Sequence, residues 1–124
     1  MTTKDFRELD KIYLHDSGII SIQHSERDSP MIFKLNLIVD EETMELGHGE
    51  ITFYDVKDVS SDPDLMKMSW RAISVSVAEV TYTQHSDRWE IKWYVSVYEG
   101  SQQPWSSVIS FSTTSFNYVE TKNN

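Results

Sequence analysis

The chain has 124 residues, 39% of them hydrophobic and 12% aromatic, and its 20 acids and 11 bases give a formal net charge of −9. This length and composition fit one folded domain, residues 1–124, and exclude a low-complexity disordered chain. The negative charge disfavours nucleic acid and an anionic membrane as partners, because phosphate binding requires clustered Lys and Arg.

The beginning of the chain predicts one short helix followed by short strands. Thr3 is a candidate N-cap, and Phe6 and Leu9 would share one face of the helix that follows it. After this helix, short strands or one bent strand are expected at residues 13–14 and 19–23.

Hydrophobic and polar residues then alternate, which is the period of a half-buried strand. Phe33, Leu35 and Leu37 would form the apolar face of one strand, and Ile51 and Phe53 that of the next. Because Gly47 and Gly49 precede Ile51, we expect this second strand to begin only at residue 50 and to end at residue 56.

A second short helix is predicted at residues 62–67, where Asp62 is a candidate N-cap and Pro63 occupies the first helical position. A run rich in β-branched residues follows at 72–83. Its apolar positions change parity after Ala78, which indicates a bulge or bend near Glu79.

The clearest alternation covers residues 89–98, after a hairpin loop expected at 84–87. One face of this strand is apolar and consists of Trp89, Ile91, Trp93, Val95 and Val97. The opposite face is mixed and consists of Glu90, Lys92, Tyr94, Ser96 and Tyr98. Residues 108–112 and 116–119 are the last expected strands.

The connections between most of these strands are too short for a crossover helix, which favours antiparallel pairing. The sequence therefore predicts a mainly β fold, an antiparallel sandwich or partly open barrel of about seven strands with one or two short helices. No repeat or linker divides the chain, so we expect a single domain.

Neither a signal peptide nor a membrane span is expected. Residues 1–7 lack an apolar core, and the longest apolar stretch, residues 32–39, is interrupted by Lys34 and Asn36. We therefore expect a cytoplasmic protein.

The negative charge is concentrated in residues 40–64, the acidic window, which holds nine acids and one base for a net charge of −8. One interpretation is a solvated loop and strand edge that aid solubility. The other is a docking surface for a basic protein, with Glu45, Asp58, Asp62 and Asp64 as its contacts. Asp55 is expected instead to bond backbone amides at a sheet edge.

Three aromatic residues are candidates for a recognition site. Tyr94 and Tyr98 lie on the mixed face of their strand, and Trp105 follows Pro104 in a polar connection. They would join the partner surface or bind a small ligand or carbohydrate. For Trp105, the favoured interpretation is a loop aromatic that folds back onto the rim of the sandwich.

Motifs for catalysis are not found. The absence of cysteine excludes thiolate metal sites and thiol catalysis, and the chain has no glycine-rich phosphate loop and no G-x-S-x-G nucleophile turn. His48 and Glu50 share a strand face and could hold a metal with a third ligand from elsewhere, but such pairs are mostly surface polar residues. We expect no enzymatic activity, no cofactor and no bound metal.

Short patterns in the first half of the chain resemble a group of small bacterial β-rich proteins whose first long strand opens with L-H-D-S/C-x-I. The matching residues are Leu14-His15-Asp16-Ser17 with Ile19, Ile20 and Ile22, then Phe33-x-Leu35-x-Leu37 and Ile51-x-Phe53-x-x-Val56. Some of these proteins are grouped with immunity proteins of contact-dependent or polymorphic toxin systems. The resemblance implies structural roles for Asp16, which would bind turn amides, and for His15, which would bridge to a neighbouring strand.

Three hypotheses about function follow. The first, which the resemblance and the charge both favour, is a protein-binding module of immunity type that neutralises a basic toxin through an acidic surface. The second is a small-ligand or carbohydrate-binding β-barrel with a pocket lined by Tyr94, Tyr98 or Trp105. The third is a hydrolase that uses carboxylates of the acidic window.

Overall fold

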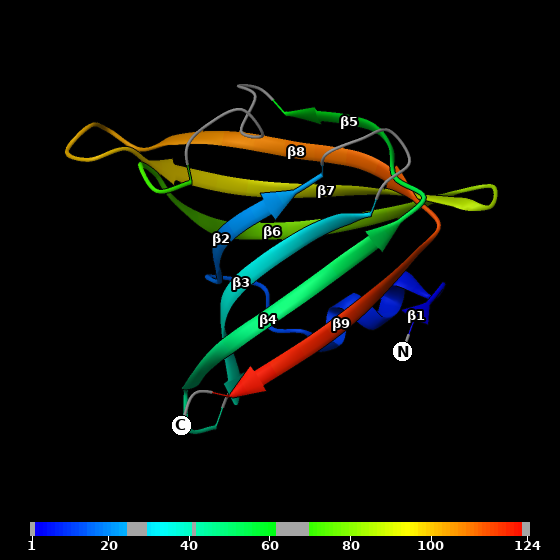
Figure 1. The fold of residues 1–124 in the computed structure, drawn as a ribbon, viewed down its shortest axis with the longest axis horizontal. Helices are drawn as coiled ribbons and strands as arrows, with labels where there is room; N and C mark the ends of the chain where they lie inside the picture. The colour runs from blue at the N-terminus through cyan, green and yellow to red at the C-terminus, as the bar shows by residue number, and fades with distance from the viewer. Residues whose placement is uncertain (1, 25–29, 41, 62–69, 123–124) are drawn as a thin grey trace.

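The computed structural model describes residues 2–24, 30–40, 42–61 and 70–122. In these residues nine strands form one antiparallel sheet, accompanied by one short 3-10 helix, η1 (Figure 1). The strand order is β1-β9-β4-β3-β2-β6-β7-β8-β5. In chain order the elements are β1 (Thr2–Thr3), η1 (Phe6–Lys11), β2 (Gly18–Gln23), β3 (Met31–Asp40), β4 (Glu45–Tyr54), β5 (Lys57–Ser61), β6 (Ser74–His85), β7 (Arg88–Tyr98), β8 (Trp105–Thr113) and β9 (Ser115–Lys122).

The mainly β, antiparallel prediction is confirmed, and the sheet is open rather than closed into a barrel. Nine strands replace the expected seven, because the described residues include the edge strands β1 and β5, which carry little period-2 signal. The helix predicted at 62–67 lies outside the described residues. The first helix is present, but its N-cap is Asp5 rather than Thr3, which belongs to β1.

The strand β4 begins five residues earlier than expected, because Gly47 and Gly49 lie inside it rather than in a turn. Both glycines are buried on the inner face of the sheet. A Cβ atom at Gly49 would lie 2.5 Å from Cδ2 of Leu37 and 3.0 Å from the ring of Tyr118. A larger residue at position 49 would therefore require the end of the Leu37 side chain and the ring of Tyr118 to shift.

The sheet has two halves that cross diagonally in Figure 1, one made of β2, β3, β4 and β9 and the other of β6, β7, β8 and β5. Their inner faces pack together through aromatic rings. Phe33 of β3 stacks on Trp93 of β7, with ring centroids 4.3 Å apart, and Phe53 of β4 meets Phe111 of β8 at 4.9 Å. The hydrophobic core therefore lies between the two halves.

The long strand β6 contains the expected bulge. Its register against β7 shifts between Val77 and Glu79, so Ala78 is the extra residue. The hairpin to β7 is also confirmed, since His85 pairs with Arg88 across a tight turn in which Ser86 has a φ of 61°.

The predicted faces of the longest strands are correct. Phe33, Leu35 and Leu37 are buried, and so are the inward residues of β7 from Ile91 to Val97. Trp89, at the start of β7, is half-buried and contacts Phe6 of η1, with ring centroids 5.3 Å apart.

Trp93 gives the first prediction. Its side chain is fully buried and stacks on Phe33, so Trp93→Ala removes a large apolar surface and leaves a cavity between the two halves. We expect the free energy of unfolding to fall by about 3–5 kcal/mol, measured by urea titration. The control is Tyr98→Ala, an exposed position on the same strand, where the loss should be below about 1 kcal/mol. Similar losses for both variants would contradict the assignment of the two faces of β7.

Candidate functional site

Apart from Glu50 in the middle of β4, the described acids of the acidic window fall into two separate groups. Glu45 opens β4, and Asp55 follows the other end of this ten-residue strand. A strand of that length spans about 30 Å, so the acids before and after β4 do not share one surface. We call the first group, Asp40, Glu42 and Glu45 at the β3–β4 connection, the acidic hairpin.

Asp55 belongs to the second group, the acids that follow β4, and it takes part in an ion pair that stabilises the fold. Its backbone φ is 53°, and its carboxylate accepts a hydrogen bond of 2.8 Å from Nη1 of Arg88. Arg88 also donates to the main-chain carbonyls of Asp55 and Ser112. The ion pair thus ties the turn after β4 to β7 and β8, whereas the sequence predicted a bond to backbone amides.

Asp58 is exposed on the edge strand β5, at an irregularity in its pairing with β8, and its φ is 57°. Glu45 lies in the other half of the sheet, so the structure does not bring these two candidates together. Asp62 and Asp64 lie outside the described residues.

The three candidate aromatic residues occupy two different faces. Tyr94 and Tyr98 are on the outer face of β7, where Tyr94 lines a shallow groove of about 360 Å³ with Ser96, Ser106 and Val108. Trp105 is not an exposed loop residue. It begins β8 and packs against the core, and its Nε1 donates to Glu99 at 3.3 Å. The three side chains therefore do not line one pocket, and the open sheet provides no barrel interior for a ligand.

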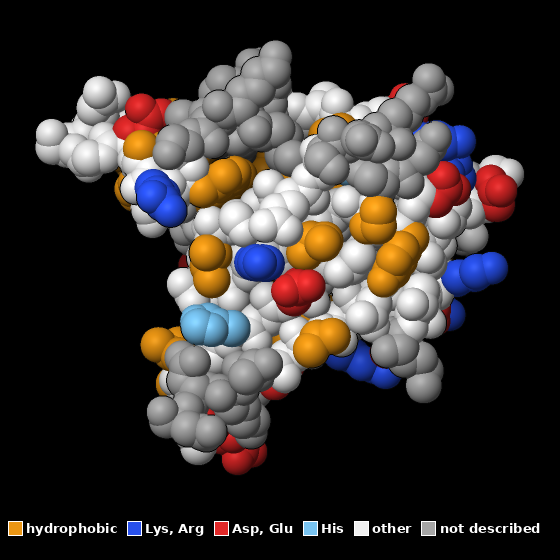
Figure 2. Space-filling model, viewed as in Figure 1, with side chains coloured by type: hydrophobic (Ala, Val, Ile, Leu, Met, Phe, Trp, Pro, Cys, Tyr) orange, Lys and Arg blue, Asp and Glu red, His pale blue; other side chains and the backbone are white. Residues whose placement is uncertain are grey.

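The outer face of β2, β3, β4 and β9 carries a surface that the sequence analysis missed. Four of the six exposed large hydrophobic residues in the described part of the chain lie on this face or at its hairpin tip: Ile20, Met44, Leu46 and Val119. Leu46 is 61% exposed and Val119 is 55% exposed. Figure 2 looks onto this face and shows hydrophobic side chains spread around a lysine, an acid and a histidine.

This outer face, which we call the β4 face, is shaped by alternation along β4. Leu46, His48 and Glu50 point outward, while Gly47 and Gly49 point inward. The face holds a groove of about 330 Å³ lined by Ile20, Lys34, Leu35, His48, Gly49, Glu50 and Val119. Outward and inward positions do alternate along this part of β4, but glycines occupy the inward positions. Because glycine has no apolar side chain, the alternation of apolar and polar residues that marks a half-buried strand is not visible there.

The acidic hairpin adjoins the β4 face and has a defined turn. Oδ1 of Asp40 accepts hydrogen bonds from the backbone amides of Glu42 at 3.0 Å and Thr43 at 3.3 Å. Met44 follows with a φ of 58°, and its side chain is exposed. Carboxylates and an exposed apolar side chain are therefore held together at the end of the sheet.

His48 and Glu50 share the β4 face, as their spacing predicted. Within the described ranges, no group of three or more His, Asp or Glu side chains could hold a metal ion. Glu50 instead lies opposite Lys34 in the register of β3 and β4.

The segment Leu14–Ser17 forms a turn that docks onto the bulge of β6. Nδ1 of His15 lies 2.8 Å from the carbonyl oxygen of Ala78, which is the bridging contact expected of His15. The backbone amide of Asp16 donates a hydrogen bond to the carbonyl oxygen of Val77, and the backbone amide of Val77 donates one to the carbonyl oxygen of Ser17. The Asp16 carboxylate lies 3.4 Å from Nε2 of His15. The turn therefore closes the edge of β6 where β2 ends its pairing.

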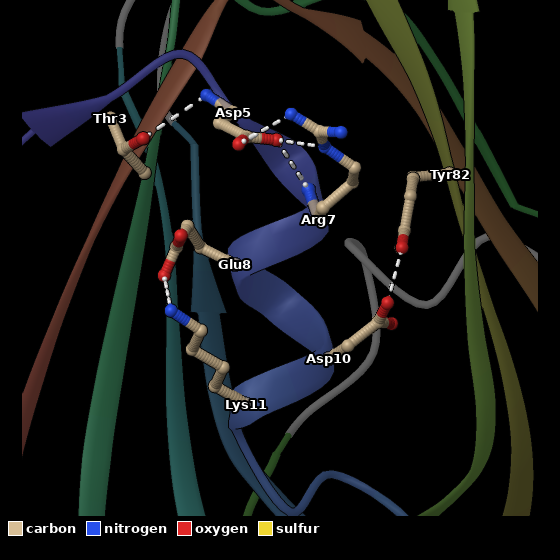
Figure 3. Close-up of polar contacts among 7 residues, drawn as sticks. All are labelled: Thr3, Asp5, Arg7, Glu8, Asp10, Lys11 and Tyr82. Carbon is tan, nitrogen blue, oxygen red and sulfur yellow. Dashed lines mark hydrogen bonds and ion pairs between the residues drawn. The ribbon is translucent and has the colours of Figure 1, made fainter.

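The helix η1 is fixed by polar contacts on both sides (Figure 3). Asp5 caps it by accepting from the backbone amide of Arg7, and the Arg7 guanidinium lowers the pKa of Asp5 below its ordinary value. On the opposite side of η1 from Glu8 and Lys11, the hydroxyl of Tyr82 donates to Asp10 at 2.5 Å. This bond raises the pKa of Tyr82.

A groove of about 500 Å³ lies between η1 and β9. Its lining is Thr3, Glu8, Lys11, Ile12, Phe116 and Tyr118. Tyr118 is half-buried and its hydroxyl donates to Glu120 at 2.6 Å. Burial raises the pKa of Tyr118, and the hydrogen bond to the carboxylate raises it further.

Comparison with known proteins finds no matching family model, curated protein or solved structure. In the part of the chain that the structure describes, no helix is long and apolar enough to cross a membrane. The site must therefore be interpreted from its geometry.

The raised pKa of Tyr118 gives the second prediction. Because the folded state holds the phenol protonated more tightly than the unfolded state does, this contribution to stability is complete below the unfolded pKa of about 10. It is then lost as the pH rises from that value toward the folded pKa. We expect the urea midpoint of the wild type to fall above about pH 10, and Tyr118→Phe to reduce that fall. Tyr98→Phe is the matched control at an exposed tyrosine. An equal alkaline fall in Tyr118→Phe and in the wild type would contradict the prediction.

Proposed function

We propose that this chain is a non-enzymatic protein-binding domain that docks a basic protein through the acidic hairpin and the adjoining β4 face. The observation that carries the proposal is the joint placement of exposed apolar side chains and acidic side chains at one end of the sheet. Leu46 and Met44 are both more than half exposed and lie beside Glu42 and Glu45. Apolar contacts flanked by charge are characteristic of protein interfaces.

The charge of this surface indicates the kind of protein that it would bind. The acidic hairpin contributes three carboxylates, whereas the described side chains of the β4 face include one base, Lys34, opposite Glu50. A basic partner would be attracted to such a surface from a distance, which raises its association rate at low salt.

The resemblance to immunity proteins suggests the kind of partner, a basic toxin such as a cationic nuclease that this domain neutralises in the cytoplasm. A rigid sheet face suits that role, because a preformed surface loses little conformational freedom on binding. The turn of Leu14–Ser17, on which the resemblance partly rests, has structural contacts, so the proposed interface lies elsewhere on the domain.

The test is the association rate of a purified basic partner, encoded beside this gene or recovered from the native host with the immobilised chain. We expect Glu42→Lys with Glu45→Lys to slow association about tenfold at low salt, and the wild-type rate to fall as salt rises. Leu46→Ala should chiefly speed dissociation, because it removes a contact formed only in the complex.

The matched control carries the same charge change away from the proposed surface, Glu79→Lys with Asp87→Lys, both exposed positions on or beside β6. This control should retain a rate near that of the wild type. Equal slowing by both pairs, or a rate that does not depend on salt, would contradict docking at the acidic hairpin. Loss of binding in Tyr98→Ala with no effect at the hairpin would place the interface on the other half of the sheet.

A further inference from the structure

The sulfur atoms of this chain all belong to its five methionines, because the sequence contains no cysteine. Met31 and Met44 lie in the described residues, and Met1, Met66 and Met68 lie outside them. Met31 is 0% exposed in the hydrophobic core, whereas Met44 is 59% exposed. A peroxide converts a thioether to a sulfoxide only where it can reach the sulfur atom. The two described methionines therefore differ in their access to such an oxidant.

The turn of the acidic hairpin holds Met44 at the end of the sheet. Its backbone lies in the left-handed region, with a φ of 58°. Just before it, the amides of Glu42 and Thr43 are bonded to the carboxylate of Asp40. Just after it, β4 begins with Glu45, which pairs with Asp40. An oxidant can therefore reach the side chain of Met44 while the strands on both sides of the turn stay paired.

The reaction at this sulfur is a two-electron oxidation. The sulfur atom of Met44 attacks one oxygen atom of hydrogen peroxide, so that an S–O bond forms and the O–O bond breaks. The leaving hydroxide takes the proton of the transferred oxygen and departs as water. The sulfur is oxidised and the peroxide is reduced, so one thioether and one hydrogen peroxide give one sulfoxide and one water.

Oxidation of Met44 would change the chemistry of the proposed docking surface. A sulfoxide is polar, so this side chain would lose the apolar character that it shares with its exposed neighbour Leu46. The fold would lose little, because the side chain is already mostly in water. A partner that covers the side chain would lose an apolar contact and would have to desolvate the sulfoxide oxygen.

We propose that Met44 is an oxidation site for hydrogen peroxide, and that its sulfoxide weakens docking of the basic partner while the fold stays intact. The effect on docking rests on the proposed function and adds a means of regulating the same surface. The reaction itself depends only on the placement of Met44 and Met31, so it is tested on the chain alone.

The first experiment treats the folded chain with hydrogen peroxide and follows sulfoxide formation at each methionine by proteolysis and mass spectrometry. We expect Met44 to be oxidised at least about tenfold faster than Met31. The control is the same treatment in concentrated urea, where both side chains are exposed and the two rates should become similar. Equal rates in the folded chain, or a faster rate at Met31, would overturn the assigned site.

The second experiment measures how tightly the peroxide-treated chain binds the purified basic partner. We expect the dissociation constant to rise about five- to tenfold, and the urea midpoint of the treated chain to stay unchanged. The matched control is Met44→Leu, because leucine has a similar volume and no sulfur atom. Any effect of oxidising the other methionines occurs in this variant too, so treated Met44→Leu should bind as tightly as it does before treatment.

Two results would overturn the effect on docking and leave the proposed function standing. One is equal weakening of binding in the treated wild type and in treated Met44→Leu. The other is unchanged binding by the oxidised wild type when the hairpin charge variants do slow association. Failure of the proposed function is a different result, in which the hairpin charge variants themselves have no effect on the partner.

Discussion

The two halves of the sheet are held together by side chains more than by strand pairing. In the described residues, β2 and β6 join the halves through two residue pairs, at Gly18 and Ile19. The stack of Phe33 on Trp93, with ring centroids 4.3 Å apart, lies between the halves and is wholly buried. Without the packing of the inner faces, to which this stack belongs, each half would expose an apolar face to water, so the rest of the fold depends on that packing.

The inner faces could be predicted from the sequence because their cause is local. A strand places alternate side chains on one side, so the spacing of Ile91, Trp93 and Val95 already fixes which side is buried. The bulge at Ala78 was also visible, since an extra residue shifts the parity of the apolar positions after it. Predicting these features does not require knowing which strands become neighbours in the sheet.

The candidate site could not be predicted in this way, because it depends on contacts between distant segments. Tyr118, from the end of the chain, packs over Gly49 inside β4, and the sequence pattern does not reveal that contact. The ion pair between Asp55 and Arg88 also depends on tertiary structure. The acidic window is continuous in sequence, but a ten-residue strand inside it divides it in space.

The same alternation separates the side chains that stabilise the fold from those that are exposed on the outer face. Leu37 and Gly49 face the core, where a Cβ atom at Gly49 would lie 2.5 Å from Cδ2 of Leu37, so a larger residue there requires its neighbours to shift. Leu46 and Val119 lie on the opposite side of the same half-sheet and are mostly exposed, so substitutions there cost the fold little. A domain built in this way can change its outer face while Phe33 and Trp93 keep the two halves together.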